Sequence, residues 1–135
     1  KVLKTYSESL EVPVDKWRFA DGSGLSAANR VTTNGLSELL FNVQQQPYFN
    51  TYFISLPVAG NSERMVGGTL RKRLTAENLQ NRIYAKTGYI PNVYTLSGYV
   101  KGNSGKQYIF SILLENKANG NTHIDRAMAS IVKSL

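Results

Sequence analysis

Hydrophobic positions in the second half of the chain follow a period of two, which is typical of β-strands. The alternation predicts strands near residues 82–90, 93–101 and 106–115. Pro91-Asn92 and residues 102–105 supply turn-forming residues between these strands. Short sequential turns predict an antiparallel sheet of at least three strands. Residues 108–114 are apolar at both alternating sets of positions except at Ser111, so we expect the last strand to be buried on both faces.

Two segments in the first half have the 3.6-residue period of amphipathic helices. The apolar face of the first is formed by Val2, Leu3, Tyr6 and Leu10. No capping residue precedes it, a pattern expected of a chain cut from a longer protein. In the second helix, Thr32 or Thr33 is a candidate N-cap. Its apolar face is formed by Leu36, Leu39, Leu40 and Val43.

A third helical pattern ends the chain. We expect Thr122 to cap this helix and Asp125 to lie near its positive end. Its apolar stripe is formed by Ile124, Ala127, Met128, Ile131, Val132 and Leu135. A helix with one such stripe packs on a sheet. The sequence therefore predicts an α+β fold, with an antiparallel sheet packed by a C-terminal helix.

The segments between these elements carry turn, packing and rim signals. Asp21-Gly22-Ser23-Gly24 predicts a tight turn held by side-chain-to-backbone bonds from Asp21. Residues 47–60 are densely apolar and predict a short helix that leads into a packed loop. Residues 61–81 are polar and contain glycine, so we expect them to cover or rim a cleft.

Composition excludes several kinds of chemistry. The chain has 135 residues, the length of one domain or of part of a larger one. It has no cysteine, which excludes disulfides, thiol nucleophiles and cysteine-bound zinc. A single histidine, His123, argues against a Ser-His-Asp triad and a zinc hydrolase within this chain. No apolar run approaches membrane-spanning length, and no apolar leader follows Lys1.

The net charge of +7 admits two interpretations. One is an anionic partner such as nucleic acid, anionic lipid or a carboxylate-bearing wall polymer. The other, which we favour, is general solubility. The densest cluster, residues 71–73, is short and lacks the interleaved aromatic residues of a nucleic-acid platform. We therefore expect no nucleic-acid partner.

Lys86-Thr87-Gly88 is the strongest candidate for a functional site. Its glycine lets a substrate lie close to the backbone, Thr87 offers a hydroxyl, and Lys86 offers a fixed positive charge. A strand edge binds extended peptides through its backbone. These features suit a peptide ligand that ends in a carboxylate. The tripeptide alone is a weak signal because it also occurs in ordinary turns.

Four motifs together resemble the C-terminal part of a class C penicillin-binding protein, in the D-alanyl-D-alanine carboxypeptidase/endopeptidase family. The matching segments are residues 21–26 with Asn29, residues 55–60, residues 85–88 and residues 93–99. The resemblance implies that residues 1–135 are the C-terminal portion of a transpeptidase-like, β-lactamase-like domain. It also implies that the S-x-x-K and S-x-N motifs, which carry the nucleophile, precede residue 1.

The resemblance implies roles for four residues. Lys86 is similar to the lysine that supplies positive potential at the acylating centre, and Thr87 to the residue that binds the substrate carboxylate. Gly88 permits close approach, and the backbone N–H of Tyr89 is expected to form half of an oxyanion hole. Family members often carry a small hydroxylated residue at the position of Tyr89, so the tyrosine narrows the expected cleft. No metal or cofactor is implied.

The resulting hypothesis is a fragment of a serine-type D-alanyl-D-alanine carboxypeptidase/endopeptidase, inactive without its nucleophile. Its expected ligands are peptidoglycan stem peptides and β-lactams, its expected location is the periplasm or cell envelope, and the fragment is expected to form a homodimer. The alternative is a non-catalytic module that binds peptide carboxylates or anionic cell-wall polymer. Nucleic-acid binding is a weaker third hypothesis.

Two local motifs imitate catalytic ones. Residues 130–133 read S-x-x-K, but they fall in the last turns of the terminal helix, where a solvated helix end is the preferred interpretation. Residues 48–50 read Y-x-N within a group of aromatic residues, where a packing role is preferred.

Overall fold

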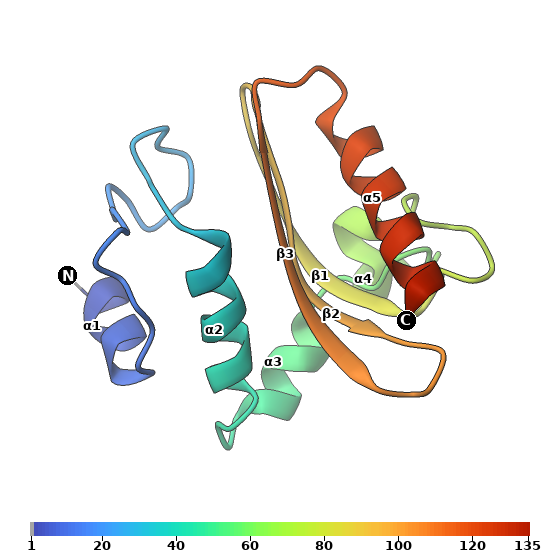
Figure 1. Ribbon diagram of the computed structural model, residues 1–135, viewed down its shortest axis with the longest axis horizontal. Helices are drawn as coiled ribbons and strands as arrows, with labels where there is room; N and C mark the ends of the chain where they lie inside the picture. Colours follow the sequence, from blue (N-terminus) through green and yellow to red (C-terminus); the bar gives the residue numbers. More distant parts are fainter. Residues whose placement is uncertain (1) are drawn as a thin grey trace.

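The computed structural model describes residues 2–135 and has an α+β architecture, as the sequence predicts (Figure 1). The elements in chain order are α1 (Val2–Ser9), α2 (Thr33–Val43), α3 (Phe49–Ser55), α4 (Arg64–Gly67), the 3-10 helix η1 (Gly68–Leu70), β1 (Ile83–Ile90), β2 (Val93–Lys101), β3 (Gln107–Glu115) and α5 (Gly120–Ser134).

The three strands form one antiparallel sheet in the order β1-β2-β3. Each strand begins and ends within one residue of its predicted position. Asn92, in the turn between β1 and β2, has a φ of 65°, a left-handed conformation that asparagine tolerates. The register pairs Gly88 with Thr95 across this hairpin.

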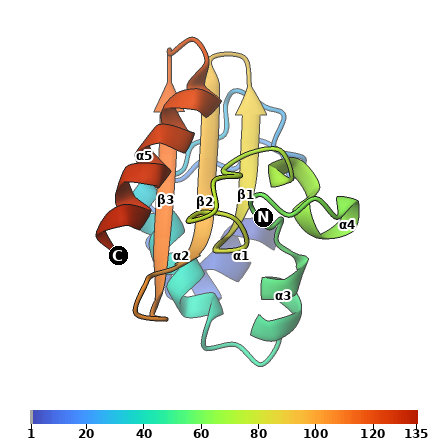
Figure 2. The same ribbon diagram turned by 90° about the vertical axis from the view of Figure 1, so that its right-hand side faces the viewer.

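Helices cover both faces of the sheet. Figure 1 shows the sheet nearly edge-on, with α5 on one side and α2 on the other. Figure 2 looks onto the α5 side, where α4 lies next to β1. We refer to the two sides of the sheet as the α5 face and the α2 face.

The larger core lies between α5 and the sheet. Ile124, Met128 and Val132 of α5 are fully buried. The buried residues of β2 and β3 in the same cluster are Leu96, Val100 and Phe110. Burial of each such side chain contributes about 1.5–3 kcal/mol. Packing therefore holds α5 on the sheet, as the apolar stripe predicts.

Aromatic side chains join the α2 face to the helices. Tyr99 is fully buried, and its hydroxyl donates to the backbone carbonyl of Leu40 in α2 at 2.8 Å. Burial raises the pKa of the Tyr99 phenol above its usual value, so the group stays a neutral donor. Phe53 of α3 stacks on Tyr84 of β1 with ring centroids 4.5 Å apart. These contacts fix α2 and α3 against one end of the sheet.

Of the two predicted caps for α2, the structure selects Thr32. Its hydroxyl accepts a hydrogen bond from the backbone N–H of Gly35 at 3.1 Å. Trp17 donates its indole N–H to the same hydroxyl at 3.3 Å. The cap therefore also ties the preceding segment to the start of α2.

The predicted start of α5 is wrong. The helix begins at Gly120, after Asn119 in a left-handed conformation, and no side chain caps it. Thr122 already lies in the first turn. Asp125 does not act at the helix end, because it forms an ion pair with Arg73. Left-handed backbone at Asn119 ends the preceding turn and sets the helix start three residues earlier than expected.

Two burial predictions also need correction. Ala127 and Ile131 are exposed, so the buried stripe of α5 is narrower than expected. In β3 only Phe110 is buried between residues 108 and 114, and its neighbours are half-buried on both faces. The reason is that β3 lies at an edge of the described sheet, where it has a neighbouring strand on one side only.

Candidate active site

The outer edge of β1, which does not face β2, is covered for only part of its length. Residues 57–60 run antiparallel to it, and the backbone N–H of Ala85 donates to the carbonyl of Pro57 at 3.0 Å. Within residues 2–135, no backbone hydrogen bond is made to this edge beyond Ala85. Residues 86–90 therefore leave an open strand edge.

Two residues direct their backbone groups toward the open edge. Alternate residues of an antiparallel strand pair to opposite sides. Because Ala85 donates outward, Thr87 and Tyr89 are the next outward residues, while Lys86 and Gly88 pair with β2. The N–H groups of Thr87 and Tyr89 and the carbonyl of Tyr89 are thus available to an extended peptide, while the Thr87 carbonyl already accepts from the Lys86 ammonium. The outward direction of the Tyr89 N–H is compatible with its predicted role as an oxyanion donor.

Lys86 lies at the start of the open edge. Its side chain is exposed, and its ammonium donates to the backbone carbonyl of Thr87 at 2.7 Å. In β1 it shares the α2 face with Tyr84, two residues earlier. The charge is therefore beside the open edge. The catalytic role assigned to Lys86 stays a prediction.

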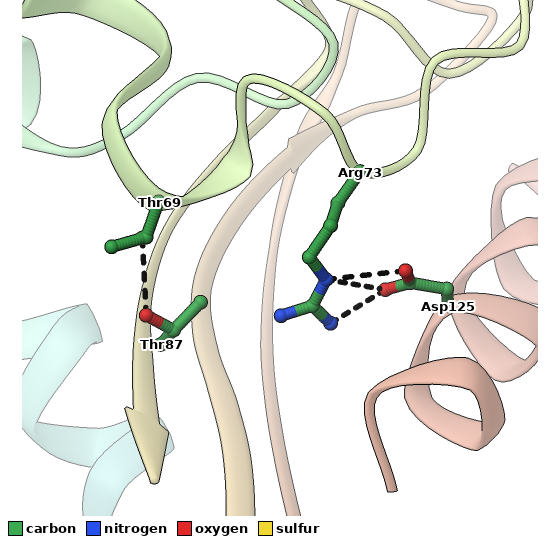
Figure 3. Close-up of polar contacts among 4 residues, drawn as sticks. All are labelled: Thr69, Arg73, Thr87 and Asp125. Atoms are coloured by element: carbon green, nitrogen blue, oxygen red, sulfur yellow. Dashed lines mark hydrogen bonds and ion pairs between the residues drawn. The ribbon is translucent and has the colours of Figure 1, made fainter. Parts of the chain in front are cut away.

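Thr87 points to the α5 face. Its hydroxyl donates to the hydroxyl of Thr69 in η1 at 3.0 Å (Figure 3). This contact brings residues 61–81 to the strand edge, so the segment does rim the site, as its composition predicts. Both hydroxyls are exposed and retain acceptor capacity for a ligand or water.

Gly88 is required by close packing with the next strand. A Cβ atom at this position would lie 2.4 Å from the hydroxyl oxygen of Thr95, its cross-strand partner. The Thr95 side chain occupies the space that a side chain at residue 88 would need. Because residue 88 is glycine, the strand surface stays flat there and the Thr95 hydroxyl can remain on the α2 face.

A pocket of about 330 Å³ lies at this end of the sheet. Gly88, Tyr89 and Thr95 form its sheet wall, and residues 18–31 supply much of the rest. Most of its surface is apolar, with contributions from Phe19 among other side chains. Lys86 does not line it, but the pocket begins two residues further along the same strand. The open edge and the pocket therefore form one continuous candidate site.

Asp21 organises the wall of the pocket that comes from residues 18–31. Its carboxylate accepts bonds from the Asn29 amide, the Ser23 hydroxyl and the backbone N–H groups of Ser26 and Gly24, at 2.7 to 3.1 Å. The Asn29 amide is the largest cause that holds the pKa of Asp21 below its ordinary value. Asp21 also lines the pocket. The structure thus combines the expected turn-holding role with a place in the site.

The two imitating motifs have structural roles. Ser130 and Lys133 are exposed on α5, away from the open edge. Tyr48 bonds through its hydroxyl to the hydroxyl of Tyr6, and Phe49 packs against Tyr99. His123 is exposed in the first turn of α5. The preferred interpretations of the two motifs are confirmed.

Across residues 2–135, no three histidine, aspartate or glutamate side chains gather in a way that suits a metal ion. No helix in this range has the length and apolar character needed to cross a membrane.

Sequence reasoning missed two features of the site. One is Thr69, which meets Thr87 across 18 positions of sequence. The other is the Arg73–Asp125 pair, in which the guanidinium contacts both carboxylate oxygens (Figure 3). Neither has a local sequence signal, because each depends on how residues 61–81 fold back on the sheet.

Comparison with known proteins gives one family match over the described chain. The model of the D-Ala-D-Ala carboxypeptidase 3 (S13) family matches residues 2–135. The D-alanyl-D-alanine carboxypeptidase of Actinomadura sp. (strain R39) is 44% identical over 93 residues, covering 69% of this chain and 17% of the relative. Penicillin-sensitive carboxypeptidase A of Dictyostelium discoideum is 31% identical over 141 residues, covering 96% of this chain and 25% of the relative.

A solved structure shares the fold. Penicillin binding protein 4 of Haemophilus influenzae, complexed with a β-lactam, superposes with a TM-score of 0.77 at 26% identity, covering 87% of this chain and 26% of that one. The chain thus spans about a quarter or less of the length of these three proteins.

Proposed function

The chain belongs to the D-Ala-D-Ala carboxypeptidase 3 (S13) family, and from this we propose that it is the C-terminal portion of a serine-type D-Ala-D-Ala carboxypeptidase/endopeptidase domain. Its substrate would be the stem peptide of peptidoglycan, and β-lactams would bind at the same place. The proposed location is the periplasm or cell envelope. The β-lactam complex of the Haemophilus influenzae relative supports the choice of ligand.

The observation that carries the proposal is the open edge of β1 at residues 86–90. Outward backbone groups at Thr87 and Tyr89 bind an extended peptide, and the ammonium of Lys86 adds positive potential beside them. The side chains of a peptide held there enter the pocket next to Gly88. Peptide backbone, carboxylate and side chain are thus each matched by a group of this site.

Each site residue has a defined part in the proposed reaction. A serine on another part of the longer protein attacks the carbonyl of the D-Ala-D-Ala bond, and the carbonyl oxygen gains negative charge. The Tyr89 N–H donates to that oxygen, while Lys86 stabilises it at longer range. Thr87 positions the peptide carboxylate, and Gly88 lets the peptide lie against the strand. Loss of one oxyanion donor costs about 10²–10³ in rate.

Covalent labelling with a fluorescent penicillin tests this proposal. The 135-residue chain alone should not be labelled, because the proposed nucleophile lies on another part of the longer protein. The longer protein should be labelled at a serine outside this chain. Covalent label on the isolated chain would contradict the assignment of the nucleophile.

A Lys86→Ala substitution in the longer protein tests the assigned role of the lysine. We expect its acylation rate to fall by about 10²-fold or more. Lys106→Ala, in the exposed turn between β2 and β3, removes the same charge far from the site and is the matched control. Equal acylation of the two variants would remove Lys86 from its role.

The alternative is a module that binds peptide carboxylates or anionic cell-wall polymer without catalysis. The open edge favours it, since backbone pairing alone suffices for binding. In that case the longer protein would bind the peptide but would never be labelled by penicillin.

A further inference from the structure

A second, basic concavity lies beside the open edge. It has a volume of about 450 Å³. Its lining residues are Arg64, Gly68, Thr69, Arg71 and Lys72, and we call it the 64–72 pocket. All three cationic residues are exposed. The ion pairs within residues 2–135 are Lys4–Glu8 and Arg73–Asp125, so none of the three charges is neutralised by a described carboxylate.

The 64–72 pocket adjoins the point where the β1 edge becomes open. Thr69 accepts the Thr87 hydroxyl at 3.0 Å, which joins the pocket to β1 (Figure 3). Gly68 packs on Pro57, since a Cβ there would lie 3.3 Å from the proline ring. Pro57 is the residue whose carbonyl closes the covered part of the edge. Figure 2 shows α4, at the head of this segment, beside β1 on the α5 side.

The direction of a bound peptide follows from the residues already on this edge. Residues 57–60 run antiparallel to β1. Antiparallel pairing is also the more stable arrangement per residue. A peptide on residues 86–90 that continues this pairing runs opposite to β1. Its carboxyl end therefore points toward Pro57 and the 64–72 pocket.

We propose that Arg64, Arg71 and Lys72 attract the terminal carboxylate that Thr87 positions in a peptide on the β1 edge, and so select peptides that end in a free carboxylate. This inference rests on the proposed function and adds a specificity element to it. Guanidinium groups bind carboxylates through paired N–H donors. A single exposed charge contributes little to binding energy. Three charges around one pocket together give a measurable preference for a peptide with a free carboxylate. An amidated or extended peptide lacks the charge that the pocket recognises.

An NMR titration of the 135-residue chain tests the proposal. The probes are N-acetyl-D-alanyl-D-alanine and the same dipeptide with a C-terminal amide. The free acid should shift the amide signals of Thr87, Tyr89 and Thr69, with affinity about tenfold higher than that of the amide. The triple variant Arg64→Gln/Arg71→Gln/Lys72→Gln should bind both peptides equally.

A matched variant removes three charges elsewhere. Lys106→Gln/Lys117→Gln/Lys133→Gln changes exposed residues far from the 64–72 pocket and should keep the tenfold preference. Circular dichroism checks that both triple variants remain folded. If Thr87 and Tyr89 shift while acid and amide bind equally to the unmodified chain, the inference fails but the proposed function stands. If neither peptide shifts Thr87 or Tyr89, the proposed function fails as well. Inorganic phosphate binding at Thr69 as tightly as the free acid would also overturn the assignment to a peptide carboxylate.

Discussion

Individual residues at the open edge are fixed by contacts on both faces of β1. Gly88 is the clearest case, because the Thr95 hydroxyl occupies the place of its missing side chain. We expect Gly88→Ala to lower the free energy of unfolding by about 1–3 kcal/mol, the usual cost of overpacking. Adding Thr95→Ala removes the obstructing oxygen and should recover most of that loss.

Urea denaturation of the single and double variants measures this coupling. The control is Gly105→Ala in the β2–β3 turn, where no atom lies near the added Cβ but φ is +78°. Its cost is backbone strain, which Thr95→Ala should not relieve. If Thr95→Ala failed to rescue Gly88→Ala, the steric account of this glycine would be wrong.

Asp21 makes the pocket sensitive to acid. Its pKa in the folded chain lies below the ordinary value because of the Asn29 amide and three weaker donors. The unfolded state therefore takes up a proton first as pH falls. The stabilisation of the folded chain by the ionised Asp21 carboxylate is complete above the ordinary aspartate pKa of about 3.9. It is lost as pH falls through the lower pKa of the folded state.

NMR titration of the Gly24 and Ser26 amides between pH 6 and pH 2 measures this directly. Both donate to the Asp21 carboxylate, so both signals should move with one midpoint below the ordinary value. Asp21→Asn should abolish the transition. A midpoint at or above the ordinary aspartate value would contradict the hydrogen-bonded arrangement.

At the scale of secondary structure, a single ion pair links residues 61–81 to α5. Arg73 and Asp125 are only 15% and 27% exposed, and the contact is bidentate. We expect Asp125→Asn to lower the free energy of unfolding by about 1–3 kcal/mol, since a partly buried guanidinium loses its partner. Glu8→Gln breaks the well-exposed Lys4–Glu8 pair and should cost less than about 0.5 kcal/mol. Equal costs in urea denaturation would contradict the structural role of the Arg73–Asp125 pair.

Periodicity predicted the strands well and the start of α5 poorly. Strand boundaries follow from alternation and from turns such as Pro91-Asn92, which are local signals. The start of α5 depends on left-handed backbone at Asn119, which competes with the stronger capping signal of Thr122. The candidate site shows the same contrast between local and non-local signals. Residues 86–89 were predicted from a local motif, whereas Thr69 was not predicted. Contacts between distant segments leave no trace in local pattern.

Close approach of strands sets a further constraint that sequence alone does not reveal. At Gly98 a Cβ would lie 2.2 Å from the backbone carbonyl of Tyr84. No side-chain movement can relieve this contact, in contrast to Gly88. The β1–β2 spacing, and hence the position of the open edge, therefore depends on this glycine.

For the molecule as a whole, β3 presents a second edge that has no strand partner among residues 2–135. It is nine residues long and uncharged between its ends, a combination that favours pairing between chains. We expect the isolated chain to dimerise through this edge. Leu113→Lys should shift the chain toward monomer, whereas Ile131→Lys on the exposed side of α5 should not. Size-exclusion chromatography with light scattering measures the mass, and a monomeric unmodified chain would contradict the prediction.

Hydrogen exchange at the β1 edge tests the central claim most directly. Lys86 and Gly88 pair with β2, so their amides should be protected in the free chain, while the outward amides of Thr87 and Tyr89 should exchange rapidly. Saturation with N-acetyl-D-alanyl-D-alanine should slow exchange at Thr87 and Tyr89 and leave Lys86 and Gly88 unchanged. Unchanged exchange at Thr87 and Tyr89 in the presence of the peptide would contradict the account of this edge as the peptide-binding site.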